Sequence, residues 1–305
     1  MAQHQPTLLI NRQSGTARDL GLDVVRDRVI AAFEAGGCGV SVELLDGPAI
    51  EGRLRELVGE GAESVIVGGG DGTVTTAASV LRGTGTALGV LPLGTFNLLA
   101  RDLEIPSEIE EAAEVLCRGR RREIDVAEVN GRLVLCVCIA GFYPNLMARS
   151  HQTHTRAWWV KAAMVTWETL RAFMRYRSLR LELEEDDGGG GAPKVEHFRT
   201  RFLAVSNNRF EDLFGVVPRR AALDHGRLAA YISEHHSQLG LLRWMILYLI
   251  GKWEDDQDIR IREVTRLVVR TRKPKRLRLM IDGELVKEAT PLKFECFPKD
   301  LTVLC

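Results

Sequence analysis

Short apolar runs rich in β-branched residues alternate with longer amphipathic segments between Leu8 and about Val129. This alternation is typical of parallel strands joined by crossover helices. The expected strands are Thr7–Ile10, Val40–Leu45, Ser64–Val67, Ala87–Leu91 and Glu123–Val129. The expected helices are Leu20–Ala35, Ile50–Gly59, Thr75–Leu81, Asn97–Asp102 and Ser107–Cys117. The pattern predicts a doubly wound, Rossmann-like α/β domain, which binds ligands beyond the carboxyl ends of its strands.

After Asn130 the chain consists mainly of strand-like runs without helices between them. These runs are Leu133–Ile139, Leu179–Glu185, Phe202–Ser206, Arg227–Ser233, Arg266–Arg270, Arg276–Ile281 and Leu292–Cys296. Helical patterns are expected at residues 156–175 and 238–253, and the glycine-rich run at 187–192 is typical of a flexible hairpin tip. The second region is therefore predicted to be a mostly antiparallel β-sandwich or barrel, of which we take the sandwich as the prediction.

Length and composition support two domains and argue against a nucleic-acid partner. The chain has 305 residues, 45% of them hydrophobic, which suffices for two ordinary cores. The expected domains are residues 1–129 and 130–296. The formal net charge is zero, so the protein as a whole does not attract nucleic acid.

The sequence favours a soluble, cytoplasmic protein. Its six cysteines are scattered, without zinc-site spacing or a dense disulfide framework, and we expect them to be reduced. Neither a signal peptide nor a transit peptide is apparent at the N-terminus. The longest apolar run, Leu239–Gly251, is interrupted by Arg243 and is shorter than the roughly 20 residues that a membrane-spanning helix needs.

The segment Val65–Thr73 ends a buried strand in four glycines around one carboxylate, Asp71. Glycines let a backbone approach a polyphosphate closely, and the start of the next helix adds its positive end. The segment lacks the Gly-Lys-Ser/Thr of a P-loop and the spacing of a dinucleotide-binding fingerprint. It predicts a phosphate cradle, although a glycine-rich turn by itself is about as often an ordinary tight loop.

A second glycine turn, Gly89–Asn97, follows one β-α unit later. Because parallel strands end at the same edge of a sheet, both turns should open on that edge and converge on one ligand. Two unrelated ordinary loops are the less favoured alternative.

In this order, Gly69–Thr73, Leu91–Asn97 and Ala100–Pro106 resemble the diacylglycerol kinase catalytic family. That family includes bacterial lipid kinases, sphingosine kinases and ceramide kinases, and its first domain is similar to that of NAD kinases and phosphofructokinases. Further matching segments are Ile124–Asp125, Gly141–Pro144, Val205–Asn208, Leu223–Gly226 and Ile281–Glu284. The resemblance thus extends over nearly the whole chain, and it implies that residues 297–305 return to the first domain.

The resemblance implies an ATP-dependent lipid kinase that phosphorylates the hydroxyl of diacylglycerol or a related lipid alcohol, with Mg²⁺ bridging the phosphates. It implies a role in lipid metabolism such as phospholipid biosynthesis, with peripheral contact at the inner membrane face. The residues that it assigns to the nucleotide site are Asn11, Gly69, Gly70, Asp71, Gly72, Thr73 and Thr95.

For the chemistry, the resemblance implies that Glu284 accepts the proton of the lipid hydroxyl across an interdomain cleft. Some relatives instead give the aspartate at Asp71 a role in activating the acceptor or organising Mg²⁺, and the sequence leaves both assignments open. A regulatory Mg²⁺ site of some relatives would fall on Asp224 here, because His225 occupies the position before Gly226. An Asp-Gly-Glu sequence by itself is commonly a hairpin turn with an exposed acid.

Several positions depart from the family pattern and keep a second function open. Leu98 follows Asn97 where the family often has an aspartate, and Thr75 and Thr76 replace the usual Asn and Glu. The alternative is a catalytically weak lipid- or nucleotide-binding protein that retains the kinase fold.

Basic residues cluster near the end of the chain, along two expected strands and the turn between them. They are Arg262, Arg266, Arg270, Arg272, Lys273, Lys275, Arg276 and Arg278. The cluster is either a solvated sheet face, which we slightly favour, or a surface that attracts anionic headgroups.

Overall fold

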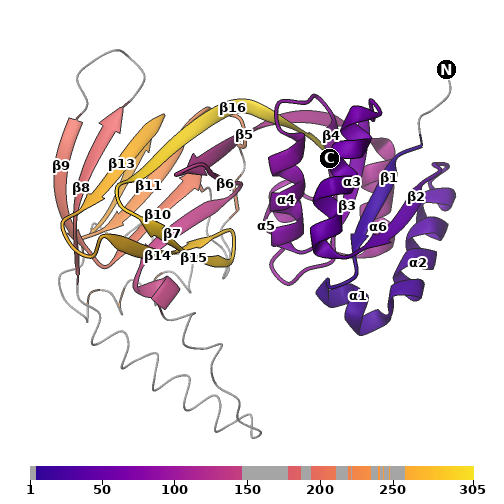
Figure 1. Ribbon diagram of the computed structural model, residues 1–305, viewed down its shortest axis with the longest axis horizontal. Coiled ribbons are helices and arrows are strands. Elements are labelled where there is room, and N and C mark those ends of the chain that lie inside the picture. Colours follow the sequence, from indigo (N-terminus) through magenta and orange to yellow (C-terminus); the bar gives the residue numbers. More distant parts are fainter. Residues whose placement is uncertain are drawn as a thin grey trace, which may run out of the picture. The chain divides into compact units, whose positions relative to one another are not determined.

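A computed structural model describes residues 5–145, 178–186, 194–210, 219–220, 222–234, 240, 243, 247 and 258–305. The chain divides into two compact units (Figure 1). The first contains Met1–Val126, Leu223–His225 and Phe297–Cys305, and the second contains Ala127–Ala222 and Gly226–Cys296. The sequence pattern put the division after Val129 and did not indicate that Leu223–His225 belongs to the first unit. Among the described residues, no helix is long and apolar enough to cross a membrane.

The first unit is built on a parallel sheet with the strand order β2-β1-β3-β4. These strands are β1 (Thr7–Asn11), β2 (Ser41–Leu45), β3 (Ser64–Gly69) and β4 (Ala87–Pro92). Almost every residue of β3 and β4 is buried, as expected for strands that are covered on both faces. The chain leaves β1 toward β2 and returns to β3 on its other side, so the sheet has a switch point between β1 and β3. The predicted α/β fold of this region is confirmed.

Helices cover this sheet in packed pairs, α2 with α6 and α3 with α4. They are α1 (Gly15–Leu20), α2 (Leu22–Ala35), α3 (Gly47–Gly59), α4 (Asp71–Leu81), α5 (Leu98–Asp102) and α6 (Ile109–Arg118). The expected helix Leu20–Ala35 corresponds to α2, while the short α1, which Gly21 separates from it with a positive φ of 93°, was not predicted.

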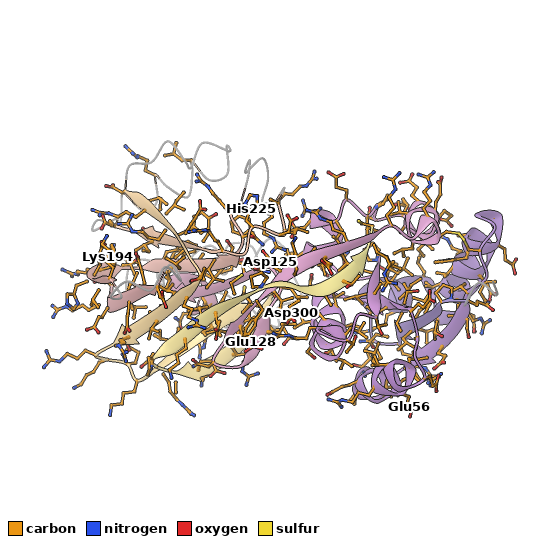
Figure 2. All side chains as sticks on the ribbon, turned by 90° about the horizontal axis from the view of Figure 1, so that it is seen from above. Glu56, Asp125, Glu128, Lys194, His225 and Asp300 are labelled. Carbon is orange, nitrogen blue, oxygen red and sulfur yellow. A yellow bond between two sulfur atoms is a disulfide. The ribbon has the colours of Figure 1, made fainter. Side chains whose placement is uncertain are left out.

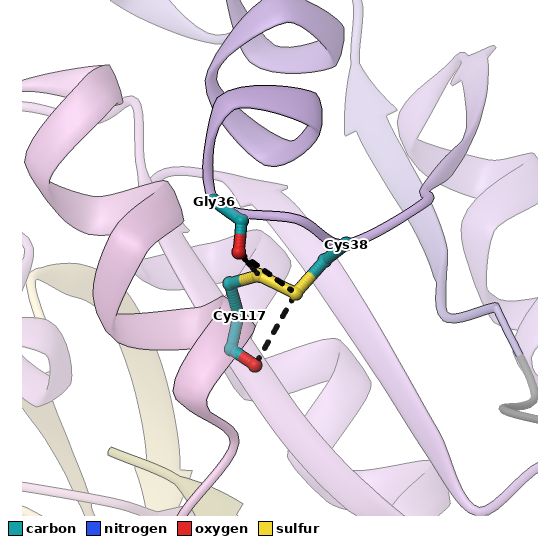
Figure 3. The surroundings of a disulfide bond; sticks show 3 residues. All are labelled: Gly36, Cys38 and Cys117. Atoms are coloured by element: carbon teal, nitrogen blue, oxygen red, sulfur yellow. Dashed lines mark hydrogen bonds between the residues drawn. A yellow bond between two sulfur atoms is a disulfide. The ribbon is translucent and has the colours of Figure 1, made fainter.

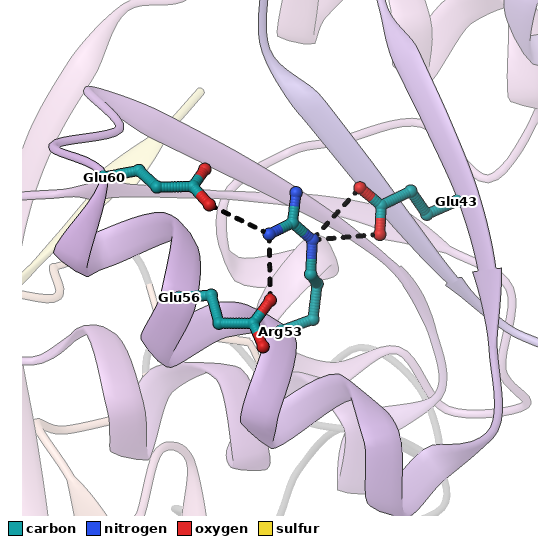
Figure 4. Close-up of polar contacts among 4 residues, drawn as sticks. All are labelled: Glu43, Arg53, Glu56 and Glu60. Atoms are coloured by element: carbon teal, nitrogen blue, oxygen red, sulfur yellow. Dashed lines mark hydrogen bonds and ion pairs between the residues drawn. The ribbon is translucent and has the colours of Figure 1, made fainter.

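An arginine on α3 joins this helix to the neighbouring strand β2 (Figure 4). Arg53 donates to both carboxylate oxygens of Glu43 at 3.1 Å, and it also pairs with Glu56 at 3.0 Å and Glu60 at 3.3 Å. Exposed pairs of this kind contribute up to about 1 kcal/mol each. The network therefore helps to orient α3 on the sheet rather than determining the fold.

The last strand, β16 (Leu292–Leu304), begins in the second unit and ends in the first. In the first unit Val303 pairs in parallel with Leu88 of β4. Arg82 donates to Asp300 at 2.6 Å, and the backbone amide of Lys299 donates to Asp125 at 2.9 Å. The side chains of Asp125 and Asp300 are labelled in Figure 2. These contacts fix Phe297–Cys305 to the first unit.

The second unit is a sandwich of two largely antiparallel sheets, as predicted. One sheet has the order β12-β11-β10-β7-β14-β15, and in the other β16 pairs with β13, β13 with β8 and β8 with β9. Their bounds are β7 (Val137–Gly141), β8 (Leu179–Asp186), β9 (Lys194–Thr200), β10 (Phe202–Asn207), β11 (Leu228–Ser233), β12 (Ile259–Val264), β13 (Arg266–Thr271), β14 (Arg276–Ile281) and β15 (Glu284–Ala289). The inward side chains of both sheets form one apolar core.

Two further strands complete those described, the nine-residue β5 (Arg121–Val129) and the short β6 (Arg132–Val134). The expected single strand Leu133–Ile139 is divided into β6 and β7, because the amides of residues 135–137 bind a side chain instead of another strand. The sequence missed β9, β12 and β15, which carry charged residues at many positions. The expected helices at 156–175 and 238–253 and the tip at 187–192 lie outside the described residues, apart from three isolated positions in the second helix.

Cys38 and Cys117 form a disulfide, which corrects the expectation that all cysteines are reduced (Figure 3). Cys38 follows α2 and Cys117 lies in the last turn of α6. The two cysteines are 79 residues apart in sequence, and their Cα atoms are 6.0 Å apart because α2 packs on α6. This pairing depends on tertiary packing, so no local spacing could have indicated it. Cys136, Cys138, Cys296 and Cys305 take no part in a disulfide.

We expect the double variant Cys38→Ser/Cys117→Ser to lower the unfolding free energy of the first unit by about 2–4 kcal/mol, because the disulfide restricts the unfolded chain. Urea unfolding followed by circular dichroism measures this change. Dithiothreitol should destabilise the unchanged protein similarly and leave the double variant unaffected, and Cys305→Ser serves as the control. A reductant-insensitive unfolding midpoint of the unchanged protein would contradict the prediction.

Candidate functional site

Two glycine turns meet at the carboxyl edge of the parallel sheet. Gly70 follows β3, and Gly94 follows β4. A Cβ atom added to Gly94 would lie 2.4 Å from the Cα atom of Gly70, which no side chain can tolerate. The amide of Leu93 donates to the carbonyl of Gly69 at 3.1 Å and continues the strand pairing up to this point. The convergence of the two turns that the sequence predicted is therefore present in the structure.

Asp71 holds the second turn against the first. Its carboxylate accepts hydrogen bonds from the amides of Asn97 at 3.1 Å and Leu98 at 2.7 Å, where α5 begins. Burial raises the pKa of Asp71, and the amides of Leu98 and Asn97 oppose this shift by stabilising the charged form. Both carboxylate oxygens are thus occupied by backbone donors of the neighbouring turn.

Asn97 shapes the second turn from within. Its backbone has a positive φ of 49°, a conformation in which asparagine is favoured over most residues. The side-chain oxygen accepts from the amide of Gly94 at 2.9 Å, and the side-chain nitrogen donates to the carbonyl of Gly94 at 2.9 Å. The sequence motif included Asn97 but gave no indication of this closing role.

The end of β1 adds a third polar group to the same edge. Asn11 donates from its side-chain nitrogen to the hydroxyl of Thr73 at 2.9 Å and accepts from the amide of Gln13 at 2.9 Å. Thr73 is buried, and a Cβ atom on Gly69 would lie 2.6 Å from it. Asn11, Gly69, Gly70, Asp71, Gly72 and Thr73 therefore lie together, and Thr95 is exposed in the adjoining turn.

The arrangement is suited to binding an anion through backbone groups. Helix α4 begins at Asp71 after an extended Gly70, and the first amides of a helix have no partner within it. The helix dipole favours negative charge at this position. Because Gly69, Gly70 and Gly94 lack side chains, the two turns can pack against each other and against Thr73 beside these amides. The residues present thus fit the phosphate groups of a nucleotide.

In the second unit, Glu284 is the first residue of β15 in a two-residue hairpin. The turn residues Asp282 and Gly283 have positive φ values of 45° and 90°, which is typical of a type I′ turn. The side chain of Glu284 is exposed, and no hydrogen bond or ion pair engages it in the described part of the chain.

Asp282 anchors this hairpin to a neighbouring segment of the chain, a role that the sequence did not indicate. Its fully buried carboxylate accepts from the amides of Leu135 at 2.7 Å, Cys136 at 2.9 Å and Val137 at 2.9 Å. Burial raises the pKa of Asp282, and these three amides together with the charge of Arg220 oppose the shift. The turn that presents Glu284 is therefore fixed to the start of β7.

Arg220 supplies the positive charge near Asp282. It is only 1% exposed, and it donates to the carbonyls of Leu135 at 2.8 Å and Asn207 at 2.6 Å. Two consecutive arginines, such as Arg219 and Arg220, are typical of a protein surface. The sequence therefore did not indicate that Arg220 is buried.

Asp224 belongs to the first unit and lies 3.6 Å from Arg122 in an exposed ion pair. Among the described residues, no group of three or more histidine, cysteine, aspartate or glutamate side chains is arranged to hold a metal. The Mg²⁺ site at Asp224 stays a prediction.

Models of protein families match both units of this chain. The diacylglycerol kinase catalytic domain matches residues 5–129, and the YegS C-terminal NAD kinase beta sandwich-like domain matches residues 144–305. The chain belongs to the diacylglycerol kinase catalytic family. The resemblance that the sequence motifs indicated is thereby confirmed.

Curated relatives support the same family over shorter stretches. A protein of Pseudomonas aeruginosa strain PAO1 named "Probable lipid kinase YegS-like" is 39% identical over 138 residues, which are 44% of this chain and 45% of the relative. A protein of the same name from Cronobacter sakazakii is 42% identical over 83 residues, which are 26% of this chain and 28% of the relative. The matched part of this chain thus spans less than half of the length of these relatives.

Solved structures share the fold across both units. A crystal structure of a diacylglycerol kinase from Bacillus anthracis str. Sterne has a TM-score of 0.71 at 17% identity. A second structure from the same organism has a TM-score of 0.75 at 19% identity. Both comparisons cover 100% of this chain and 98% of the other. At these identities the similarity concerns the fold.

We expect Gly94→Ala to separate the two turns, because its methyl group would overlap the backbone at Gly70. The unfolding free energy should fall by about 1–3 kcal/mol, the cost of overpacking a tight contact. ATP affinity, measured by isothermal titration calorimetry, should fall with it.

Gly52→Ala is the matched control for this change. Gly52 lies inside α3 with open space around its Cα atom, so alanine there should stabilise the helix by about 0.5–1 kcal/mol. Unaltered stability and ATP affinity in Gly94→Ala would argue against the close approach of the turns.

Removing the Asp282 carboxylate should leave three amides and the Arg220 charge buried without their partner. We therefore expect Asp282→Ala to lower the unfolding free energy of the second unit by about 3–5 kcal/mol. Urea unfolding measures the loss, and Asp224→Ala, which removes an exposed carboxylate, should change it by less than about 1 kcal/mol. A similar small change in Asp282→Ala would refute the anchoring role.

Proposed function

We propose that this protein transfers the γ-phosphoryl group of ATP to the hydroxyl of diacylglycerol or a related lipid alcohol. The observation that carries the proposal is the contact of Gly70 with Gly94 at the amino end of α4, where backbone amides can surround a polyphosphate. Membership of the diacylglycerol kinase catalytic family and the names of the curated relatives support this activity.

In the proposed reaction, the lipid hydroxyl oxygen forms a bond to the γ-phosphorus while the bond from that phosphorus to the oxygen bridging to the β-phosphate breaks. ADP leaves, and the hydroxyl proton passes to the carboxylate of Glu284. This transfer depends mainly on positioning and on neutralising phosphate charge. Asn11, Thr73 and Thr95 would line the nucleotide, and Asp71 would hold the two turns in position.

The surroundings of Glu284 suit the role of proton acceptor better than those of Asp71 do. A proton acceptor needs a carboxylate oxygen that can reach the reacting hydroxyl. Asp71 already uses both oxygens for the amides of Asn97 and Leu98. The rigid turn beneath Glu284 leaves its side chain exposed.

Mg²⁺ is part of the proposal as a bridge between the phosphates. The ion usually retains several waters and is bound by one or two carboxylates together with substrate phosphates. Bound in this way, it would neutralise charge on the transferred group.

The lipid substrate leads us to propose a cytoplasmic protein that works at the inner membrane face. Its product, a phosphorylated lipid, would serve phospholipid biosynthesis.

A catalytically weak lipid- or nucleotide-binding protein is the second candidate. Leu98 favours it, because this residue stands where the family often has an acid. The amide of Leu98 nevertheless contributes a hydrogen bond to Asp71, so the turn remains held without that acid. Incubation with labelled ATP, Mg²⁺ and a panel of lipids in mixed micelles separates the candidates. Binding of ATP without transfer to any lipid would favour the second.

Glu284→Gln should lower turnover at least about 10²-fold, the lower range for loss of proton-transfer catalysis. Asp71→Asn should lower it by at least about 10²-fold as well, because the two turns that position the nucleotide lose the carboxylate that joins them. For Glu284→Gln the loss should fall on kcat, because the nucleotide turns stay intact. For Asp71→Asn the KM for ATP should also rise, because an amide cannot accept both backbone hydrogen bonds.

The matched control is Glu295→Gln, which neutralises an exposed carboxylate that pairs with Arg266 in the same unit as Glu284. Its turnover should equal that of the unchanged protein. Normal turnover of a folded Glu284→Gln variant would remove Glu284 from the mechanism.

A further inference from the structure

The structure divides the basic cluster near the end of the chain into two parts with different surroundings. Three arginines on strands form ion pairs with glutamates, whereas Arg278 on β14 donates to the side-chain oxygen of Asn145 at 3.1 Å. Arg266 lies 2.8 Å from Glu295, and Arg270 lies 2.8 Å from Glu184. Arg262 likewise pairs with Glu196 at 3.4 Å. We call these three arginines the paired ladder. Each of them has a glutamate beside it that neutralises its charge.

The turn between β13 and β14 carries the other part. Its three cations, Arg272, Lys273 and Lys275, together with Arg276 at the start of β14, form the basic turn, and all four are exposed. Among the residues that the structure describes, no acid forms an ion pair with any of them. The basic turn therefore concentrates uncompensated positive charge within a few residues of a strand whose own arginines are neutralised.

The backbone of the basic turn is fixed, so its side chains project from a defined base. The hydroxyl of Thr271 donates to the carbonyl of Pro274 at 2.6 Å. The amide of Thr290 donates to the carbonyl of Lys275 at 3.0 Å. These hydrogen bonds use backbone groups and leave the four cationic side chains available to a partner.

Two further arginines lie at the same end of the sheet. β13 pairs with β8 so that Thr271 is opposite Leu181, and β8 pairs with β9 so that Arg180 is opposite Arg199. Figure 1 shows β8, β9 and β13 side by side. Like charges placed directly opposite each other are normally destabilising in a sheet. Both arginines are exposed, and neither has an acidic partner in the described part of the chain.

We propose that the basic turn, together with Arg180 and Arg199, docks the protein on the surface of an anionic lipid bilayer. Charge complementarity supports this partner, because anionic headgroups attract basic residues close to the surface at about 1 kcal/mol each, which is about fivefold in affinity. The net charge of the chain is zero, so attraction to a bilayer comes from local patches such as this one and not from the charge of the whole molecule.

This inference extends the proposed lipid-kinase function, since a water-insoluble substrate has to be reached in its membrane. Binding of the basic turn to a bilayer does not require the phosphoryl-transfer reaction. Binding to vesicles can therefore be measured whether or not phosphoryl transfer occurs, and failure of one proposal leaves the other distinguishable.

The test compares sedimentation with vesicles of phosphatidylcholine alone and with vesicles in which phosphatidylglycerol replaces part of it. We expect binding only to the anionic vesicles, with loss of binding near 1 M salt, where screening acts within about 3 Å. The triple variant Arg272→Gln/Lys273→Gln/Lys275→Gln should bind about 10²-fold more weakly, given about fivefold for each charge removed.

Arg262→Gln/Arg266→Gln/Arg270→Gln is the matched control, because it removes the same formal charge from the paired ladder. It should retain far more of the affinity than the basic-turn variant. The basic-turn variant should phosphorylate a short-chain diacylglycerol dispersed as monomers at the same rate as the unchanged protein. It should phosphorylate diacylglycerol in anionic vesicles more slowly.

Equal vesicle affinity of the basic-turn variant and the unchanged protein would overturn the proposal, as would equal losses in both triple variants. A duplex oligonucleotide provides the remaining comparison. If the basic-turn variant lost oligonucleotide binding but kept vesicle binding, the surface would be assigned to nucleic acid instead.

Discussion

The candidate nucleotide site depends on one contact between two backbones, the approach of Gly94 to Gly70. A single added methyl group would force these strand ends apart, so the site requires glycine for a steric reason. The contact brings the end of β4 beside the first turn of α4, where unpaired amides and the helix dipole create a positive region. The capacity to bind phosphate therefore comes mainly from backbone geometry, and cationic side chains are not needed to produce it.

Each unit uses an aspartate, half-buried in the first unit and buried in the second, to fix the turn that carries its candidate chemistry. Asp71 binds two amides of the neighbouring glycine turn, and Asp282 binds three amides at the start of β7. Burying a carboxylate is costly unless donors surround it, and burial raises the pKa of both groups. The backbone donors offset this cost and at the same time hold otherwise irregular segments in one conformation. Both aspartates thus act first as positioning groups, which leaves the exposed Glu284 as the better candidate for proton transfer.

The sequence predicted the parallel α/β unit, the β-sandwich and the meeting of the two glycine turns, because each leaves a local signature. Alternating apolar runs reveal strands, and glycines after buried strands reveal close backbone approaches. Other features depend on residues that are distant in sequence. The Cys38–Cys117 disulfide follows from the packing of α2 on α6, and the burial of Arg220 follows from carbonyls supplied by separate segments. Strands β9, β12 and β15 were missed because charged residues on their outer faces weaken the strand pattern.

Although the net charge of the chain is zero, the structure contains basic residues with acidic partners and others without them. Within one run of basic residues, Arg262, Arg266 and Arg270 form ion pairs with glutamates, while the four cations of the basic turn have no acidic partner among the described residues. Arg266 stands directly opposite Glu295, and opposite charges paired in this way on adjacent strands stabilise a sheet modestly. The same principle offers no structural reason for the second group, and still less for placing Arg180 opposite Arg199. Charges that do not stabilise the fold are better explained by a partner outside it, and an anionic bilayer is the partner that a lipid-directed kinase would encounter.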